Sequence, residues 1–519
     1  MDIFARSHFD RLPLEMKIFI FQQLSFKELG VAMMVCRDWR RIIEDPFNWR
    51  KLQPRSVYPD QVEAMLSVPR LCQLEAINIR HDPGEMFEVQ GVSQVEGAPK
   101  FKVLQVRRME TEHLRSLTLD RLGQISALAD LNLSQCNLLN VDADLLSDVI
   151  NNMTKVTLVA TLLKGPQLES ILVKMAAFTN IETLEIGLNS TDAAKHIENY
   201  KVIGEGLNKV KNLTVHEMSK QFLVDQVAYF FQKMEEETDI EGLELVNSKF
   251  IAFPDSILAS SLNNLQHLRL SSVTISEDQI KQFFKSMKIK SRLQTLIIEG
   301  KVSNVHTVDP KVFSSAVVKI PNLDMSYTNL TNNQLTQFFT EALKRKSHFD
   351  SLNLTANNLS QVSGDVLAKV VSNNIKVCCL RSSHITAEQV DAITKESLDY
   401  IHDLDLSENN LETSVPRTVS LLVNKILKVD LSQCKLNGHI LNQIFKDILD
   451  PNVNTRTLKL TVLHNACTEV SKELIAKAER KLCVTIYKKK SKFKANSMCL
   501  KCGKGPFVKL KLHKCKIEQ

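Results

Sequence analysis

The 519-residue chain is poor in tryptophan, glycine and proline, and it has no long apolar run. Its 15 glycines and 14 prolines are too few for long disordered or collagen-like segments. No stretch of about eighteen apolar residues occurs, so the sequence predicts no transmembrane helix. The first residues lack the basic, apolar and small-residue order of a secretory signal, and we expect none.

The eleven cysteines are scattered and form no tight framework. Without a secretory signal, this pattern indicates reduced thiols in the cytosol or nucleus. We therefore expect a cytoplasmic or nuclear protein, or one present in both compartments, with no membrane partner.

The formal charge of +7 is concentrated near the C-terminus. Residues 481–517 contain twelve lysines and neither an acidic residue nor an arginine, so the remainder carries +7 − 12 = −5. The body of the chain is thus mildly acidic, and the basic character belongs to its last segment.

A repeat of about 27 residues runs through the body, as in "LADLNLSQCNL" (128–138) and "IHDLDLSENNL" (401–411). Each copy alternates apolar residues through a predicted strand. We define the anchor as the last apolar residue of each such strand. Successive anchors are 25 to 30 residues apart, although a competing segment that ends at Leu119 makes the register near residues 100–130 less secure. The anchors are Ile79, Val106, Leu133, Leu158, Ile186, Val215, Leu245, Leu270, Ile298, Met325, Leu354, Leu380, Leu406, Leu431, Leu460 and Ile486.

This period resembles that of the leucine-rich repeat, in which a strand is followed by a helix or helical turn. The third residue after an anchor is often small and able to form hydrogen bonds, as the chain requires where it turns off a strand. Val273 and Met218 are exceptions. Three capping boxes, which begin at Ser276, Thr331 and Thr386, predict helix starts 55 residues apart. The third residues are Cys136, Thr161, Asn189, Ser248, Thr328, Asn357, Ser383, Asn409 and Cys434.

The predicted fold is an α/β solenoid of about sixteen strand–helix units, curved, with parallel strands on its concave face. Side chains next to the anchors point into the concavity and make it weakly acidic, which suits a partner with a basic patch. A solvated face without a function is the alternative. The candidate substrate-binding residues are Glu185, Glu244, Arg269, Asp324, Asn353, Arg381, Asp405, Asp430 and Lys459.

Both tryptophans, Trp39 and Trp49, lie in an apolar segment before the repeats. Residues 12–52 predict three short helices, the first beginning at residues 14–15, the others near 26–35 and 37–44. About forty residues cannot usually bury so much apolar surface alone. We expect the first repeats or a separate protein to cover it.

The order of residues in this segment resembles an F-box. The matching residues are Leu12, Pro13, Glu15, Ile20, Phe21, Leu24, Leu29, Val35, Cys36, Trp39, Trp49 and Leu52, and the departures are Met16, Glu28 and Gly30. The resemblance implies docking to a Skp-family adaptor and, through it, to a cullin-RING ubiquitin ligase of the SCF type. It assigns Leu12, Pro13, Ile20, Leu24, Leu29, Val35, Cys36 and Trp39 to the adaptor interface or its supporting core. Trp39 and Trp49 could equally be core residues.

The lysine-rich segment carries Cys499, Cys502, His513 and Cys515, which could complete a tetrahedral zinc site. The spacing of the second pair is unusual, and a basic segment with reduced cysteines is the alternative. Its lysines are interleaved with few aromatic residues, and no arginine occurs there, which disfavours base-specific nucleic-acid recognition. We expect no other cofactor.

No catalytic motif of the HExxH, GxxxxGK or GxGxxG type occurs. Cys378 is expected to be packed, and Cys379 to face the concavity without a catalytic role, so we predict that the chain is not an enzyme and has no catalytic residues. The predicted domains are an F-box at 8–54, a linker at 55–70, the repeats at 71–487 and a basic tail at 488–519.

The leading hypothesis is therefore a substrate-recognition subunit of an SCF-type ubiquitin ligase, in which the repeats bind the protein to be ubiquitinated. The alternative is a non-catalytic leucine-rich-repeat scaffold or inhibitor whose partner is not degraded. A third hypothesis, nucleic-acid binding through the lysines, accounts for the tail alone.

Overall fold

A computed structural model describes residues 12–21, 24, 26–44, 76–80, 103–107, 128–188, 196–250, 255–289, 291–300, 304–481 and 483–485. The chain divides into two compact units, Met1–Thr274 (unit 1) and Ile275–Gln519 (unit 2). Among the described residues, no helix has both the length and the apolar character that crossing a membrane requires.

Unit 1 begins with the three helices that the sequence predicts, α1 (Leu14–Phe21), α2 (Phe26–Val35) and α3 (Arg37–Glu44). Pro13 precedes α1, and its carbonyl accepts hydrogen bonds from the first-turn N–H groups of Met16 and Lys17. Cys36 alone separates α2 from α3. The buried side chains of the three helices are Ile18, Phe21, Leu29, Ala32 and Ile43.

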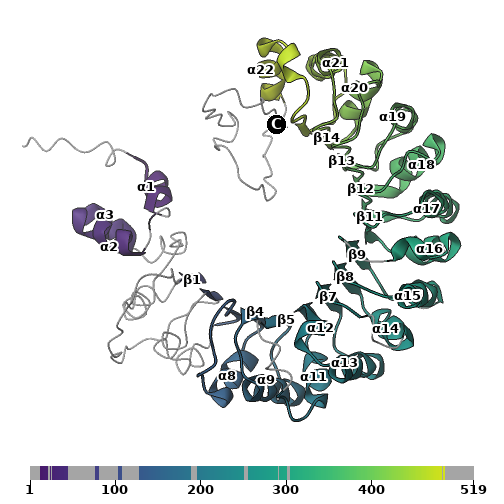
Figure 1. Cartoon of the computed structure of the whole chain (residues 1–519). Helices are drawn as coiled ribbons and strands as arrows, with labels where there is room; N and C mark the ends of the chain where they lie inside the picture. Colours follow the sequence, from purple (N-terminus) through teal and green to yellow (C-terminus); the bar gives the residue numbers. More distant parts are fainter. Residues whose placement is uncertain are drawn as a thin grey trace, which may run out of the picture. The chain divides into compact units, whose positions relative to one another are not determined.

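The repeats of unit 1 form a parallel sheet, in which each strand from β1 to β8 pairs with the next in the chain. The helices that follow the strands lie along the other side of the unit (Figure 1). The strands are β1 (Ala76–Arg80), β2 (Val103–Arg107), β3 (Asp130–Asn132), β4 (Lys155–Thr161), β5 (Thr183–Leu188), β6 (Asn212–His216), β7 (Gly242–Val246) and β8 (His267–Ser271). The helices are α8 (Ala143–Asn151), α9 (Gly165–Ala177), α11 (Lys201–Leu207), α12 (Met218–Gln221), α13 (Val224–Glu236) and α14 (Asp255–Leu262).

Unit 2 has the same internal arrangement, with strands β9 to β16 paired in parallel and in chain order. Its strands are β9 (Thr295–Glu299), β10 (Asn322–Asp324), β11 (Phe349–Asn353), β12 (Ile375–Cys379), β13 (Asp403–Asp405), β14 (Lys428–Asp430), β15 (Lys459–Thr461) and β16 (Cys483–Thr485). Its helices are α15 (Glu277–Ile289), η2 (Val305–Thr307), α16 (Pro310–Val317), α17 (Asn332–Arg345), α18 (Gly364–Asn374), α19 (Ala387–Lys395), α20 (Pro416–Lys425), α21 (Gly438–Leu449), η3 (Cys467–Glu469) and α22 (Lys472–Lys481). The predicted α/β solenoid is thus confirmed.

The core lies between the strands and the helices. The anchors from Leu133 to Leu431 are buried, and so are the apolar residues two positions before them, because alternate side chains of a strand point to the same face. Adjacent phenylalanines on three helices fill the space against the sheet, in pairs with ring centroids 5.0 to 5.3 Å apart. These pairs are Phe230–Phe231, Phe283–Phe284 and Phe338–Phe339, so they recur at about twice the repeat length.

The third residue after the anchor holds neighbouring repeats together. The buried Asn409 side chain donates to the carbonyl of Leu380, the anchor of the preceding repeat, at 2.8 Å. It also accepts from the backbone N–H groups of Ser383 and Ile385 at 3.0 and 2.9 Å. Thr161, Asn357, Ser383 and Cys434 likewise donate to the preceding anchor's carbonyl. The predicted hydrogen-bonding role is confirmed there, whereas Asn189 lies outside the described residues.

One anchor of the predicted series is wrong. Val429 pairs with Leu460 across β14 and β15, so the anchor that follows Leu431 is Val462. Asn465, the third residue after Val462, donates to the carbonyl of the preceding anchor, Leu431, at 2.7 Å, as Asn409 does to Leu380. The segment before β15 is longer than in the other repeats. The average spacing of the anchors therefore pointed to Leu460, two residues before the true anchor Val462.

The three predicted capping boxes are present, with Ser276, Thr331 and Thr386 each exchanging hydrogen bonds with the glutamine three residues on. The glutamine side chain has a second function. The amide of Gln389 donates to the carbonyls of Leu359 and Val362 in the preceding repeat, both at 2.8 Å. Gln334 and Gln167 make the equivalent pairs of contacts, so this glutamine also fastens one repeat to the next.

Replacing Asn409 by alanine should destabilise unit 2 by about 2–4 kcal/mol, because several buried backbone groups lose their partner. The matched control is the neighbouring exposed Asn410, whose replacement by alanine should change stability by less than about 0.5 kcal/mol. Urea unfolding followed by circular dichroism measures both. Equal losses of unfolding free energy for the two variants would contradict the role of Asn409 in joining neighbouring repeats.

Candidate functional site

We define the strand face as the side chains directly before and after each anchor, on the side of the sheet opposite the helices. The residues before the anchors are only half-buried, as the burial pattern of β8, β9 and β10 shows. Neighbouring strands are about 4.8 Å apart, so these side chains form columns in which each touches the next. Eight of the nine predicted substrate-binding residues lie on this face.

In unit 1 two acidic strand-face residues, Glu185 and Glu244, each have a partner on the neighbouring strand. Glu185 on β5 contacts His216 on β6 at 2.9 Å, and this hydrogen bond lowers the pKa of the Glu185 carboxyl. Gly187 makes room for the imidazole, because a Cβ there would lie 3.0 Å from the His216 Cβ. Glu244 forms an ion pair with Arg269 at 3.5 Å. Both acidic side chains are therefore engaged within the sheet, and Glu244 has its charge compensated by Arg269.

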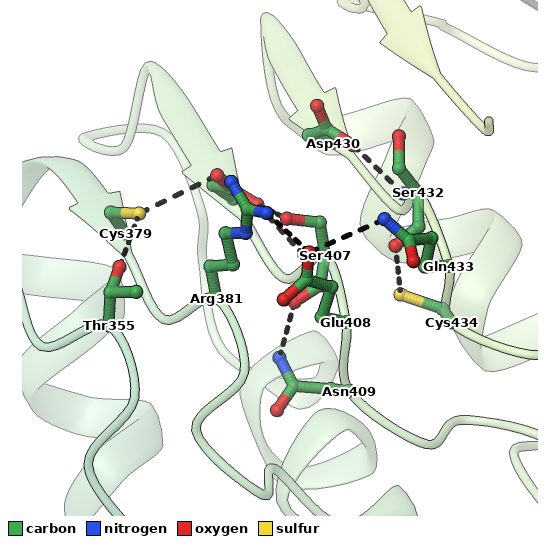
Figure 2. A network of polar contacts seen from close by, with 11 residues as sticks. Thr355, Cys379, Arg381, Ser407, Glu408, Asn409, Asp430, Ser432, Gln433 and Cys434 are labelled. Carbon is green, nitrogen blue, oxygen red and sulfur yellow. Dashed lines mark hydrogen bonds and ion pairs between the residues drawn. The ribbon is translucent and has the colours of Figure 1, made fainter. Parts of the chain in front are cut away.

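In unit 2 a continuous row of polar side chains crosses the strand face from β10 to β13. The amide of Asn353 donates to the Asp324 carboxylate at 2.7 Å, and the Thr355 hydroxyl donates to Asn353 at 2.7 Å. The Thr355 hydroxyl also lies 3.2 Å from the sulfur of Cys379. The Cys379 thiol in turn donates to Asp405 at 3.5 Å (Figure 2).

The two following aspartates end this row. The Ser407 hydroxyl and N–H both donate to Asp405, at 2.6 and 2.8 Å. The Ser432 N–H donates to Asp430 at 2.8 Å (Figure 2). Burial raises the pKa of the Asp430 carboxyl, and the negative charge of Asp405 raises it further.

A second layer of charged residues lies at the ends of the strands. Arg381 forms an ion pair with Glu408, which also accepts from the Gln433 amide at 3.3 Å (Figure 2). Arg381 is thus on the strand face as predicted, with its charge compensated. Glu408 and Gln433 were not predicted, because they follow the anchor by two residues and the sequence pattern describes only its immediate neighbours.

Lys459 is displaced from its predicted position by the shifted anchor. It pairs in register with Lys428, whereas Thr461 lies opposite Asp430 in the column that precedes the anchors. Lys428 contacts Asp403 at 2.8 Å. The column that contains Asp405 and Asp430 therefore continues with a neutral threonine and not with a lysine.

The thiols of the strand face are not activated. Cys378 is buried, as expected, and Cys379 is half-buried on the strand face. Burial raises the pKa of the Cys379 thiol, and it raises that of Cys434 to about 12. A thiol with a raised pKa stays protonated near neutral pH and is a poor nucleophile.

The N-terminal helices expose an unusual number of large apolar side chains. We define the N-terminal apolar surface as the six that are 48 to 79% exposed: Leu14, Met16, Phe19, Val31, Met34 and Val35. Isolated exposed apolar residues are common, so the notable feature of these helices is the density of the group, with six members within residues 14–35. Of these six, only Val35 was among the predicted contacts.

The other predicted adaptor-binding residues differ in their exposure. Pro13 and Cys36 are exposed, and Leu12, Ile20, Leu24 and Trp39 are half-buried. Leu29 is buried and so belongs to the supporting core. Trp39 packs edge-on against the buried ring of Phe21, with centroids 5.5 Å apart.

Several predicted residues lie outside the described part of the chain. They are Trp49 and Leu52 of the N-terminal segment and Cys499, Cys502, His513 and Cys515 of the zinc hypothesis. Within the described ranges, no group of three or more His, Cys, Asp or Glu side chains is placed to hold a metal ion. The tail zinc site stays a prediction.

Comparison with known proteins gives a family for the first segment. Residues 9–55 match the model of the family described as F-box-like. No curated protein matches the chain. The region of this match contains α1, α2 and α3.

Three solved structures with a similar chain are the following. A structure of the Toll–Spätzle complex from Drosophila has 15% identity and a TM-score of 0.30, and the match covers 76% of this chain and 52% of that one. An internalin of Listeria monocytogenes has 16% identity and a TM-score of 0.37, with 70% and 82% covered. A leucine-rich-repeat protein of Leptospira interrogans has 14% identity and a TM-score of 0.33, with 74% and 95% covered. The chain thus spans about half of the matched chain in the Toll–Spätzle structure.

The chain combines an F-box-like match at residues 9–55 with a parallel strand–helix solenoid, whose repeat of about 27 residues has the period of the leucine-rich repeat. Both are typically modules for protein interaction and not for catalysis. The polar strand face and the N-terminal apolar surface are two chemically different surfaces, which fits a protein-interaction adaptor.

The thiol environments predict an order of alkylation. Among the six cysteines whose side chains the structure describes, Cys36 is the exposed one and should react first with iodoacetamide at pH 7.5, well before Cys379. Cys434 should stay unlabelled in the folded protein, since a rise of its pKa from 9.0 to about 12 lowers its thiolate fraction about a thousandfold. Mass spectrometry of timed samples measures the order, and preferential labelling of Cys379 over Cys36 would contradict this account.

Proposed function

We propose that the protein is the substrate-recognition subunit of an SCF-type ubiquitin ligase. In this proposal the F-box-like segment docks a Skp-family adaptor, and the strand face of the repeats binds the protein to be ubiquitinated. The observation that supports it most strongly is the N-terminal apolar surface, which coincides with the F-box-like match at residues 9–55.

The energetics of this surface favour a protein partner. Its six side chains are about half exposed or more, and each fully buried large apolar side chain contributes roughly 1.5–3 kcal/mol. The three helices have only a small core beneath this surface. Burying the surface against a partner would therefore contribute to binding affinity and also stabilise the helices. Met34 and Val35 lie next to each other at the end of α2 and are the two most exposed members of the N-terminal apolar surface.

The strand face supplies the second half of the proposed function. Its charges and hydroxyl groups offer directional contacts, while its columns give an extended surface for a folded partner. A substrate held on this face is brought near the conjugating enzyme that the adaptor recruits. Proximity turns an otherwise bimolecular transfer into an effectively unimolecular step, so the chain itself needs no catalytic residue.

The double substitution Met34→Lys/Val35→Lys should weaken binding to a Skp-family adaptor by at least about 30-fold, as expected for hot-spot positions that contribute 2 kcal/mol or more. Both side chains are exposed, so the helices should keep their fold. Binding is measured by isothermal calorimetry with the purified adaptor.

The matched control is Val173→Lys/Phe178→Lys, which changes two equally apolar, exposed residues at α9. This variant should bind the adaptor like the wild type. The proposal fails if the wild type does not bind the adaptor, or if the two double variants bind it equally well.

A further inference from the structure

The connections that lead from the anchors to the helices alternate in length along the chain. In one kind of repeat the helix begins seven residues after the anchor, or nine residues in the repeat that also contains α12. In the repeats between them the helix begins ten or more residues after the anchor. The short connections lead to α9, α13, α15, α17, α19 and α21, and the long ones to α8, α11, α14, α16, α18, α20 and α22.

The capping glutamines join each short-connection repeat to the long-connection repeat before it. Gln389, at the start of α19, donates to the carbonyls of Leu359 and Val362, which both lie in the long connection before α18. Gln334, at the start of α17, donates at 2.9 Å to two carbonyls of the long connection before α16. Both amides are buried, so they satisfy carbonyls that water does not reach.

The long-connection helices have no such contact with the repeat before them. Val366 and Thr418 occupy the equivalent position at the start of α18 and α20. Valine has no side-chain donor, and the Thr418 hydroxyl donates to the Asp391 carboxylate at 3.2 Å and not to a buried carbonyl. The glutamine contact is therefore made once in every two repeats in this part of unit 2.

The packing of the helices follows the same alternation. Gly364 of α18 allows a close approach to α19, because a Cβ there would lie 3.3 Å from the Cβ of Ala392. α17 packs more extensively against α16 than against α18, and α19 more extensively against α18 than against α20. Among the described residues, one side-chain hydrogen bond joins the ends of α17 and α18, from the Asn374 amide to the Ser347 carbonyl at 2.5 Å.

The strands, in contrast, are continuous between α17 and α18. β10 and β11, the strands that precede these helices, pair in register, and the Asn353 amide donates to Asp324 across them. Beneath the sheet, the ring of Phe338 on α17 lies 5.7 Å from that of Phe349 on β11. The two repeats are thus joined firmly on the strand side and only weakly on the helix side.

We propose that the repeats of unit 2 act in pairs, which we call modules, with α16 and α17 in one module and α18 and α19 in the next. Each module opens as one cooperative unit, and the joint between α17 and α18 is where the two modules separate on the helix side. A partner on the strand face that lies across β10 and β11 spans this joint. The inference concerns the repeats alone, so it stands or falls separately from the proposed ligase function.

The modules are identified by native-state hydrogen exchange of the full-length protein in low urea, followed by mass spectrometry. We expect the amides of α16 and α17 to exchange with one common dependence on urea, and those of α18 and α19 with another. Exchange of all four helices as one group, or of α17 together with α18, would overturn the proposal.

The role of the glutamine contact is measured with Gln334→Leu, which replaces a buried amide by an apolar side chain of similar size. Exchange should become faster by about tenfold or more in both α16 and α17, because two buried carbonyls lose a donor. Gln389→Leu should have the same effect on α18 and α19 and leave α16 and α17 nearly unchanged, so the two variants test the pairing from both sides.

The matched control is Gln337→Leu, the same change at a half-buried position of α17 whose side chain has no hydrogen bond among the described residues. This variant should exchange like the wild type. A repeat array without modules would pass the effect of Gln334→Leu equally to both neighbours of α17. Equal acceleration of α16 and α18 by that variant would therefore contradict the proposal.

Discussion

The repeats depend on one constraint, which is that each anchor carbonyl must find a hydrogen-bond donor where the chain leaves its strand. A backbone carbonyl buried without a partner costs about 1–3 kcal/mol, and the repeats would bury one in every turn. The third residue after the next anchor supplies the donor, as Asn409 does for Leu380 and Asn465 for Leu431. Where the donor comes from the following repeat, as at these two positions, the same bond that satisfies the carbonyl also holds the strands in stack and register. The strand face is a consequence of that register.

The register in turn arranges charge differently in the two units. In unit 1, adjacent strands place Glu185 within hydrogen-bond distance of His216, and Glu244 beside the opposite charge of Arg269. In unit 2 the equivalent column brings Asp405 next to Asp430. Stability alone does not favour that arrangement, since like charges on neighbouring strands repel.

Most of the fold could be predicted from the sequence because its determinants are local and repeated. The alternation of the strands, the hydrogen-bonding residue three positions after the anchor and the capping glutamines all recur with the same period, so each supports the assignment of the others. The N-terminal helices lie within the ranges predicted for them. The failures have physical causes. Leu460 was predicted as the anchor in place of Val462 because sequence spacing does not reveal which residues of two strands lie opposite each other. Glu185 was predicted as a charge available to a partner because its contact with His216 depends on the pairing of two strands. Exposure within the N-terminal helices, such as that of Met34 against the burial of Leu29, likewise depends on packing and not on composition.

The central claim is that the F-box-like segment and the repeats act together, one holding the ligase and the other the substrate. The most direct measurement compares, in cells, the half-lives of proteins captured by the wild type and by Met34→Lys/Val35→Lys, with and without proteasome inhibition. The account predicts that the variant still captures these proteins, that their half-lives lengthen relative to cells with the wild type, and that proteasome inhibition removes the difference. Captured proteins with the same half-life in both cases would contradict it and would favour a scaffold whose partner is not degraded.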